Sequence, residues 1–189
     1  MEFYETVSSR HSVREFRADA ISREALDRII AAAASSPSSE NEQPWEFYVT
    51  TGKTRQELGR VVAQTTVYLT EYMDVLGPER YDDAVKWFSS LGDAPVLIAV
   101  AIPDSGDEFK LMNRLLSVGA AIENLLLATR VEGLGACPFT FSYWVKEQLA
   151  AVIGLPAGQS VVSIIAVGWP AETLAPVPAK RTDVAVWLG

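Results

Sequence analysis

The sequence contains one histidine, His11, and one cysteine, Cys137, and this scarcity excludes several classes of site. A single cysteine forms neither an internal disulfide nor a thiolate cluster around a metal. One histidine does not build a His-rich zinc site, and a Ser-His-Asp triad would have to use that same residue. The longest apolar runs, such as Val96–Ile102 and Val161–Trp169, are too short to span a bilayer. If the chain is an enzyme, we expect an organic cofactor to carry the chemistry.

Basic residues are scarce relative to acidic ones, with 16 Lys and Arg against 24 Asp and Glu and a net charge of −8. An acidic surface repels nucleic-acid backbones and the anionic face of a membrane, so we expect neither as a partner. Apolar residues make up 49% of the 189 residues, enough for one core, and we expect residues 1–189 to form one domain. The acidic stretch Met1–Glu5 lacks the pattern of a signal peptide, so a cytoplasmic protein is expected.

Helical and strand-like patterns are mixed along the chain without a regular βαβ alternation, which favours an α+β domain. Helices are predicted over Ser22–Ala34 with Ser22 as N-cap, over most of Lys53–Leu91 with a break at Gly77-Pro78, over Phe109–Glu132, and from Ser142 to Ile153. Strands are predicted over Trp45–Thr51, Val96–Ile102, Ala136–Phe141 and Val161–Val167. The Ser- and Pro-rich stretch Ser35–Pro44 is typical of an exposed loop, and Trp45 is expected in the core.

The segment Phe109–Glu132 is the longest predicted helix. Its larger apolar residues fall on one face, and small residues at Gly119–Ala121 leave another part of its surface open to close packing. The apolar face is formed by Leu111, Leu115, Val118, Ile122 and Leu125. A helix that is apolar over so much of its circumference has to be buried, either by its own domain or by a partner subunit.

Arg10-His11-Ser12-Val13-Arg14 is the most informative short motif in the sequence. In an extended segment alternate residues point the same way, so Arg10, Ser12 and Arg14 would share one face. Two guanidiniums and a hydroxyl on one face suit a phosphate monoester. A solvated basic turn beside helix-capping residues explains the same residues and is the commoner case when the motif is taken alone, so both interpretations stay open at this point.

Several short signals, in this order and spacing, resemble the FMN-dependent nitroreductase family. The resemblance starts with the R-x-S-x-R pattern at Arg10–Arg14 and continues through Phe16 to the loop that ends in Asn41-Glu42-Gln43-Pro44-Trp45. It extends through the long helix, Gly133–Cys137, the strand Val161–Gly168 and the pair Lys180-Arg181, so it covers both ends and the middle of the chain. It implies a nitroreductase-like α+β fold, with a mixed, mainly antiparallel sheet surrounded by helices and the long helix buried at a dimer interface.

The resemblance implies FMN contacts in four segments. Contacts with the phosphate and ribityl chain are implied for Arg10, His11, Ser12 and Arg14, and closure over the same phosphate is implied for Lys180 and Arg181. The loop residues implied to reach the flavin of the other subunit are Pro37, Ser38, Ser39 and Asn41. The residues whose backbone is implied to lie against the flavin ring are Pro138, Phe139 and Thr140.

The chain departs from the family pattern at two places. The family usually spaces its C-terminal cations as K-x-R, whereas Lys180 and Arg181 are adjacent, so which of them contacts the phosphate stays open. Many relatives carry glycine near Thr140 or Phe141, and the bulkier residues here are expected to narrow the substrate pocket. Without the family match, Lys180-Arg181 is equally well explained as a charged tail. Cys137 is expected to be a small buried filler rather than a reactive thiol.

The activity implied by the resemblance is that of an FMN-dependent oxidoreductase working as a homodimer with its flavin sites at the subunit interface. It would pass hydride from NADH or NADPH through flavin N5 to an electron-poor organic acceptor, nitroaromatic or quinone-like, by a ping-pong mechanism, with no side chain as catalyst and no metal. Three alternatives stay open. They are a same-fold flavoenzyme with another reaction (dehydrogenase, dehalogenase or flavin cleavage), a flavin-binding redox sensor with little turnover, and a relative that binds another phosphorylated ligand.

Overall fold

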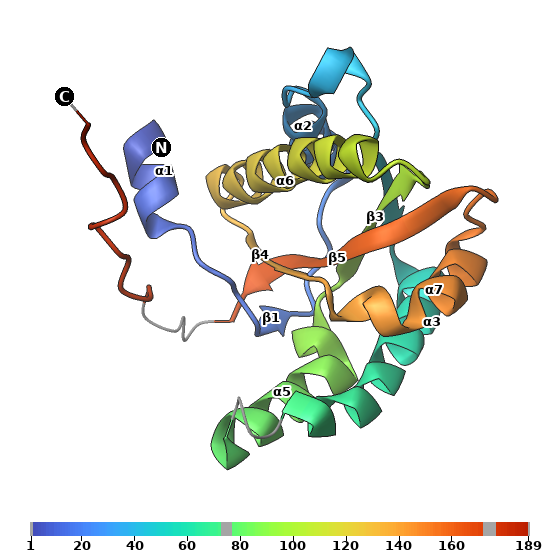
Figure 1. The fold of residues 1–189 in the computed structure, drawn as a ribbon. Helices are drawn as coiled ribbons and strands as arrows, with labels where there is room; N and C mark the ends of the chain where they lie inside the picture. The colour runs from blue at the N-terminus through green and yellow to red at the C-terminus, as the bar shows by residue number, and fades with distance from the viewer. Residues whose placement is uncertain (1, 73–76, 172–176, 189) are drawn as a thin grey trace.

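The computed structural model describes residues 2–72, 77–171 and 177–188, and a central sheet lies between layers of helices (Figure 1). The α-helices are α1 (Phe3–Ser9), α2 (Arg23–Ala34), α3 (Gly52–Ala63), α5 (Pro78–Ser90), α6 (Glu108–Val131) and α7 (Lys146–Ile153). The strands are β1 (Phe16–Arg17), β2 (Glu46–Thr50), β3 (Val96–Pro103), β4 (Gly135–Phe139) and β5 (Gln159–Pro170). The 3-10 helices are η1 (Ser39–Asn41), η2 (Gln64–Tyr72), η3 (Leu91–Asp93) and η4 (Phe141–Val145).

Strand β5 organises the sheet. The order is β1-β5-β3-β2, and β4 also pairs with β5. All of these pairings are antiparallel. Residues Ile164–Val167 of β5 pair with β3 along one edge and with β4 along the other. The predicted α+β class with a mainly antiparallel sheet is therefore confirmed.

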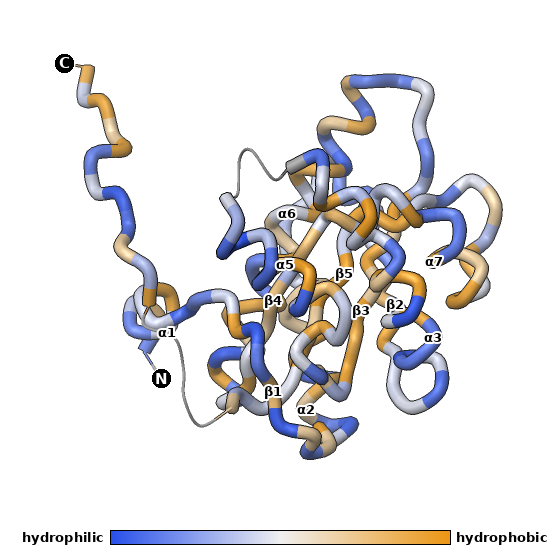
Figure 2. Tube along the Cα trace, turned by 90° about the horizontal axis from the view of Figure 1, so that it is seen from below, coloured by the Kyte–Doolittle hydropathy of each residue, from blue (hydrophilic) through white to orange (hydrophobic). Residues whose placement is uncertain are grey.

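The hydrophobic core has two layers, one on each face of the sheet. Successive residues of a strand point to opposite faces, so Val96, Ile98 and Val100 of β3 pack with α2 and α6. Leu97 and Ala99 lie on the other face, with α3 and α7. Figure 2 shows the hydrophobic colour concentrated along β3 and β5. Burial on both faces explains why β3 has no polar alternation in its sequence.

Several element boundaries agree with the sequence pattern. Ser22 caps α2 by accepting a hydrogen bond from the Ala25 N–H at 3.2 Å. Helix α5 begins at the predicted Gly77-Pro78 break, with Pro78 in its first turn. Trp45 is 8% exposed and belongs to the α2–α6 layer of the core, as expected.

The prediction that Ser142 caps a helix is wrong. Helix α7 starts at Lys146, because η4 intervenes, and within the described residues the Ser142 hydroxyl is buried without a hydrogen-bond partner. The strand predicted to reach Phe141 ends at Phe139, and the chain turns into η4 there. The sequence pattern also gave no sign of α1, whose seven residues are mostly exposed.

Helix α6 packs along α2 and against β4 with one side and leaves the other side open. Val118 and Leu125 are buried as predicted, whereas Leu115 is 46% exposed. An exposed apolar stripe runs along the open side, formed by Phe109, Met112, Leu115 and Leu116. Among the described residues α6 is also the one helix long and apolar enough to cross a membrane by length and composition, a test that core helices pass as well.

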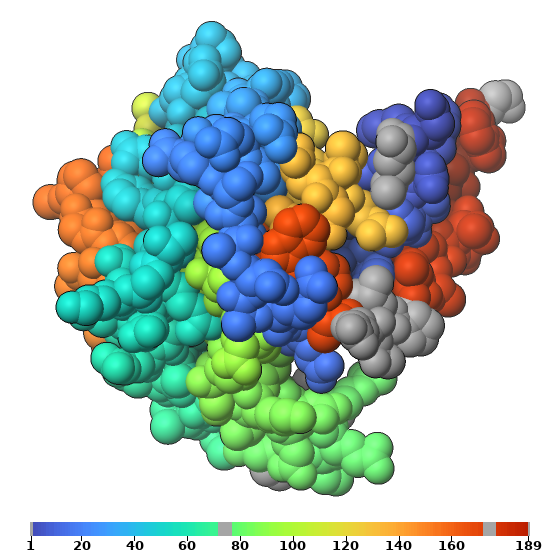
Figure 3. All heavy atoms as spheres, turned by 180° about the vertical axis from the view of Figure 1, so that it is seen from behind, coloured from blue at the N-terminus to red at the C-terminus, as the bar shows by residue number. Residues whose placement is uncertain are grey.

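Residues 177–188 form an extended segment, here called the C-terminal arm, which projects from the same side of the molecule as α1 (Figures 1 and 3). Every residue of the arm is exposed. Its tip is apolar: Val184, Val186, Trp187 and Leu188 are between 71% and 93% exposed. Contiguous exposed apolar side chains are typical of surfaces that bind a partner.

Candidate functional site

The segment Arg10–Arg14 lies directly beside strand β4. The Val13 N–H donates to the Ala136 carbonyl at 3.0 Å, and Ser12 forms a parallel bridge with Ala136. Arg10 is extended, with φ −69° and ψ 129°, as the motif required. Two stretches more than a hundred residues apart in the sequence are thereby joined, and the basic motif is attached to the edge of the sheet.

Two glycines allow this close approach. Gly135 of β4 faces Val13, and a Cβ added to Gly135 would lie 2.7 Å from the Val13 side chain. Gly92 of η3 has φ +61°, and a Cβ there would lie 1.9 Å from the Arg14 carbonyl oxygen. No larger residue fits at that separation, so these positions fix the path of the motif from both sides.

The side chains of the motif differ in the contacts that they make with the described residues. The Arg10 guanidinium pairs with Glu123 of α6, with Nε 3.1 Å from the carboxylate oxygen. Arg14 is exposed and makes no ion pair with any described residue. His11 Nδ1 lies 3.1 Å from the Ser9 carbonyl, whereas its buried Nε2 has no hydrogen-bond partner within the described part of the chain.

Cys137 lies beneath the motif and is 2% exposed. Burial raises the pKa of its thiol, and the nearby Arg14 charge and a hydrogen bond with the Ser12 side chain offset part of that effect. The thiol is therefore held protonated, in agreement with the expected role of a small buried filler. The same contacts place Ser12 and Arg14 close to one residue of β4.

The end of β4 presents backbone rather than side chains. Phe139 is buried against Trp87 and Phe88, with its ring 5.1 Å and 5.6 Å from theirs. Its carbonyl accepts a hydrogen bond from the Ser163 hydroxyl at 3.1 Å. Pro138 is partly exposed and Thr140 is fully exposed. Of these three predicted residues, Phe139 offers a ligand only its main chain.

A cavity of about 630 Å³ opens beside Thr140, between α6, α7 and the ends of β3 and β5. Its volume falls within the range of small-molecule sites, roughly 300–1,000 Å³. Tyr143 and Lys146 line it, and the Lys146 Nζ lies 5.3 Å from the centroid of the Tyr143 ring. Sequence reasoning missed both residues. The aromatic residues Phe141, Tyr143 and Trp144 at and just after the end of the predicted strand were the signal for Tyr143.

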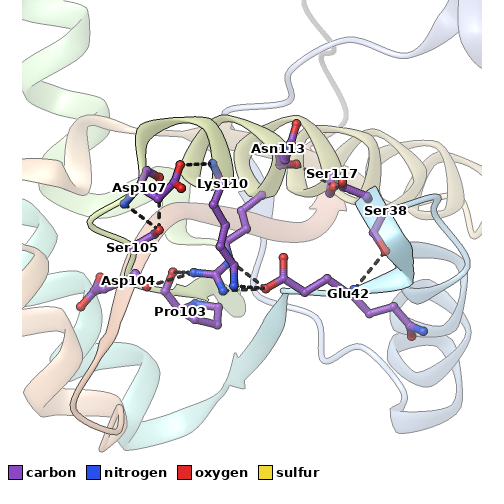
Figure 4. Close-up of polar contacts among 12 residues, drawn as sticks. Ser38, Glu42, Pro103, Asp104, Ser105, Asp107, Lys110, Asn113 and Ser117 are labelled. Carbon is purple, nitrogen blue, oxygen red and sulfur yellow. Dashed lines mark hydrogen bonds and ion pairs between the residues drawn. The ribbon is translucent and has the colours of Figure 1, made fainter.

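The loop Pro37–Asn41 lies on the other side of α6 from the basic motif. In Figure 1 the loop rises above α6, whereas residues 10–14 run below it, between α1 and β1. Ser39 and Asn41 are exposed, and the Ser39 N–H donates to the Ser117 hydroxyl of α6 at 3.3 Å. Figure 4 shows the polar contacts that hold this loop against α6. One chain therefore does not bring the loop and the basic motif together.

Lys180 and Arg181 lie on the C-terminal arm and are exposed. Arg181 contacts Asp183 of the same arm, with Nε 3.3 Å from the carboxylate oxygen. One chain thus unites two of the four predicted segments, the basic motif and the end of β4. The loop lies across α6 from these two segments, and the described residues of the arm are all exposed.

The comparisons with known proteins agree with this architecture. The model of the Nitroreductase family matches residues 7–169. A 5,6-dimethylbenzimidazole synthase from Rhodospirillum rubrum is 30% identical, over 86% of this chain and 79% of that protein. An iodotyrosine deiodinase from Haliscomenobacter hydrossis is 29% identical, over 97% of this chain and 86% of its own length. The solved structure of an FMN- and NADPH-dependent nitroreductase from Sphigopyxis sp. strain HMH superposes with a TM-score of 0.82, at 22% identity and full coverage of both chains.

Proposed function

Because the chain belongs to the nitroreductase family of flavoprotein oxidoreductases, we propose that it binds FMN and passes reducing equivalents from NADH or NADPH to an electron-poor organic acceptor. One observation carries the proposal. The Arg10–Arg14 motif is bonded to β4 through the Val13 N–H and the Ala136 carbonyl at 3.0 Å. A phosphate on the motif and a flat ring against the end of β4 could then belong to one molecule.

The residues of this site fit FMN. Arg10, Ser12 and Arg14 offer two guanidiniums and a hydroxyl to a phosphate, the pairing that guanidiniums favour. Arg10 has to exchange its Glu123 partner, 3.1 Å away, for the phosphate. Pro138 and Thr140, which are partly exposed and exposed, offer main-chain groups beside a cavity of about 630 Å³.

We also propose a homodimer, in which the second subunit completes each flavin site. The exposed stripe of α6, which includes Leu115 at 46% and Leu116 at 68%, is open in one chain. The loop residues Pro37, Ser38, Ser39 and Asn41 carry predicted FMN contacts but lie across α6 from the basic motif of their own chain. The arm carries Lys180 and Arg181, and all of its described residues are exposed. A second copy would cover the stripe and bring both segments to the partner's site.

When bound, FMN supplies hydride transfer between a nicotinamide and an acceptor such as a nitroaromatic or a quinone. In this proposal the Arg10–Arg14 motif would hold the phosphate, and main chain near Pro138 and Thr140 would contact the ring, beside the cavity in which a substrate would lie. Tyr143 and Lys146 line that cavity and would contact the substrate first. Asp104 and Glu147 line the same cavity, so charges of both signs border it.

The test is a visible absorption spectrum of the purified protein, followed by identification of the released chromophore. Flavin bands and free FMN are expected, and both should be lost in an Arg10→Ala/Arg14→Ala variant that stays folded by circular dichroism. A colourless wild-type protein that also fails to bind added FMN would sink the proposal. Arg17→Ala, which removes an exposed arginine of β1, is the matched control and should keep the flavin.

Turnover then separates the reductase from its alternatives. Steady oxidation of NADPH or NADH with a nitroaromatic or quinone supports the reductase. Two of the relatives are named for other reactions, a 5,6-dimethylbenzimidazole synthase and an iodotyrosine deiodinase. Deiodination of an iodotyrosine in place of nitro reduction would therefore favour a same-fold enzyme with another reaction. Bound FMN with negligible reduction by either nicotinamide would favour a redox sensor.

A further inference from the structure

The loop Ser38–Gln43 adopts a backbone that is unusual for its sequence. Glu40, Asn41 and Gln43 have φ of +53°, +57° and +48°. These angles lie in the left-handed region, which glycine adopts readily and larger residues rarely adopt. Three such residues within four positions persist only where the surroundings determine the backbone, and such strain is concentrated at functional sites.

Two residues of α6 hold this loop. The Arg114 Nε and Nη2 donate to one Glu42 carboxylate oxygen, at 3.0 Å and 2.6 Å (Figure 4). The Ser117 hydroxyl accepts from the Ser39 N–H at 3.3 Å. Within the loop, the Ser38 hydroxyl accepts from the Gln43 N–H at 3.0 Å. The loop is therefore bound to one face of α6 at two points.

The Arg114 side chain is also held by contacts outside the loop. Its side chain is 7% exposed, and its Nη1 donates to the carbonyls of Pro103 and Asp104 at 3.0 Å and 2.9 Å. The Arg114 guanidinium holds the pKa of the Glu42 carboxyl below its ordinary value, so that the carboxylate stays charged. Lys110 adds a second cation, 3.8 Å from the same carboxylate oxygen. A guanidinium anchored at the end of β3 gives the loop one defined position relative to the sheet.

Two of the residues implied to meet the flavin lie uncovered beside this ion pair. Ser39 and Asn41 are exposed, whereas the Glu42 side chain turns back to Arg114 and keeps 31% exposure. An ordinary connection between α2 and β2 needs neither a buried arginine nor a left-handed backbone. The ion pair therefore serves the exposed edge of the loop.

We propose that Glu42 and Arg114 are positioning residues, which hold the loop Ser38–Gln43 in the conformation that contacts FMN in the partner subunit's site. This inference rests on the proposed function. The ion pair orders the loop before assembly, so the partner's flavin contacts hydrogen-bonding groups that are already in place. The entropic cost of ordering the loop then does not weaken FMN binding.

The test uses Glu42→Gln, with Glu40→Gln as matched control. Glu40 lies two residues away in the same loop and forms no ion pair with the described residues. Amide hydrogen exchange of the FMN-free protein is measured at Ser39, Asn41, Glu42 and Gln43, whose N–H groups are bonded within the loop or to α6. Exchange should accelerate about tenfold in Glu42→Gln and stay unchanged in Glu40→Gln. Ser117→Ala, which removes the hydrogen bond between the Ser39 N–H and α6, should also accelerate amide exchange in the loop.

Flavin binding is measured next, by the dissociation constant for FMN and the visible circular dichroism of the bound flavin at a temperature where every variant is folded. Glu42→Gln should bind FMN about tenfold more weakly, with an altered dichroism band, and Glu40→Gln should match the wild type. Faster exchange with an unchanged dissociation constant and band would overturn the positioning role. Unchanged exchange would overturn the ion pair as the element that orders the loop.

A mixed dimer tests action on the partner's site. One subunit carries Arg10→Ala/Arg14→Ala and the other carries Glu42→Gln. If the loop acts on the partner, one site per dimer combines an intact motif with an intact loop and binds FMN with wild-type affinity. If the loop acts on its own subunit, neither site combines an intact motif with an intact loop, no site binds FMN with wild-type affinity, and the proposal fails. A wild-type protein that binds no FMN would overturn the proposed function, and it would do so before any variant is made.

Discussion

The Arg10–Arg14 motif and the C-terminal arm carry the basic residues predicted for one phosphate, yet the fold treats them in opposite ways. The motif is bonded to β4, pressed between Gly92 and Gly135, and paired with α6 through Arg10 and Glu123. The arm is exposed along its whole described length, and Arg181 contacts only its neighbour Asp183 within the described residues. In the proposed homodimer, one half of the phosphate site would form within a single chain, and the other half would form only on assembly.

This difference separates two kinds of failure. A substitution at the motif acts within one folded subunit. It should weaken FMN binding more the further it displaces the guanidiniums of Arg10 and Arg14. In the proposed homodimer, a change at the arm would act on subunit association, so its effect on FMN binding should depend on protein concentration. Variants that damage only one of the two regions can therefore be told apart.

The largest effect is expected from shortening the arm after Asp183, which removes the apolar tip and keeps Lys180 and Arg181. The four large apolar side chains of the tip are between 71% and 93% exposed in one chain. If they are buried in the dimer, their loss raises the dimer dissociation constant a hundredfold or more, on the order of 3 kcal/mol. Light scattering after size exclusion measures it. Val177→Ala, at the base of the arm, is the control, and a shortened chain that dimerises like the wild type would show that the tip lies outside the interface.

A smaller effect, about a thirtyfold weaker binding of FMN, is expected from Gly92→Ala. An added Cβ would lie 1.9 Å from the Arg14 carbonyl and force the motif away from its position. Gly52→Ala is the matched control, because Gly52 has a similar φ of +55° and open space around it. Both variants bear the cost of a left-handed alanine, about 1–2 kcal/mol, so a difference between them in FMN titration isolates the contact. Equal affinities would mean that the motif is not held by η3.

Single substitutions in the arm should have a still smaller effect and decide which cation reaches the phosphate. Lys180→Ala or Arg181→Ala, whichever removes the contact, should weaken FMN binding about tenfold, since a hydrogen bond to a charged group contributes about 1.5–3 kcal/mol. The dissociation constant for FMN of the other variant should stay within about twofold of the wild-type value. Fluorescence titration of FMN at a protein concentration well above the dimer dissociation constant keeps association out of the comparison. Two unchanged variants would assign the arm to association alone.

The smallest effect is expected at the partner of Arg10, and it has the opposite sign. Glu123 is 48% exposed and pairs with the Arg10 guanidinium. Glu123→Gln removes a carboxylate that competes with the phosphate for Arg10, so FMN binding should tighten about twofold. The same titration checks it, with Glu24→Gln on α2 as a surface control that changes the net charge equally. Weaker binding would show that Glu123 orients Arg10 rather than competing for it.

The parts of the fold that follow local rules were predictable from the sequence. Ser22 caps α2, the Gly77-Pro78 break starts α5, and the apolar run Val96–Ile102 becomes the central strand β3. Each depends on neighbours within a few residues or on a single period of hydrophobicity. Ser142 failed as a cap because tertiary packing buries its hydroxyl, which a local pattern does not record.

The candidate site depends on contacts that the sequence does not display. Joining Ser12 to Ala136, and Gly92 to the Arg14 carbonyl, requires knowing which segments meet at the sheet edge. The Glu42–Arg114 pair spans 72 positions and connects two charges that look like ordinary surface residues in the sequence. The resemblance to a family supplied the short motifs that carry its pattern. It did not supply this chain's own way of holding them in place.

The burial of Cys137 makes the chain a ready background for site-specific labelling. The thiol is 2% exposed and its pKa is raised, so it stays out of reach of maleimide reagents in the folded protein. A cysteine introduced at the arm as Val186→Cys would then be the one reactive thiol of the chain, without removal of the native one. A spin label or fluorophore at that position would report the distance between the two arms of a dimer, or from an arm to a bound flavin.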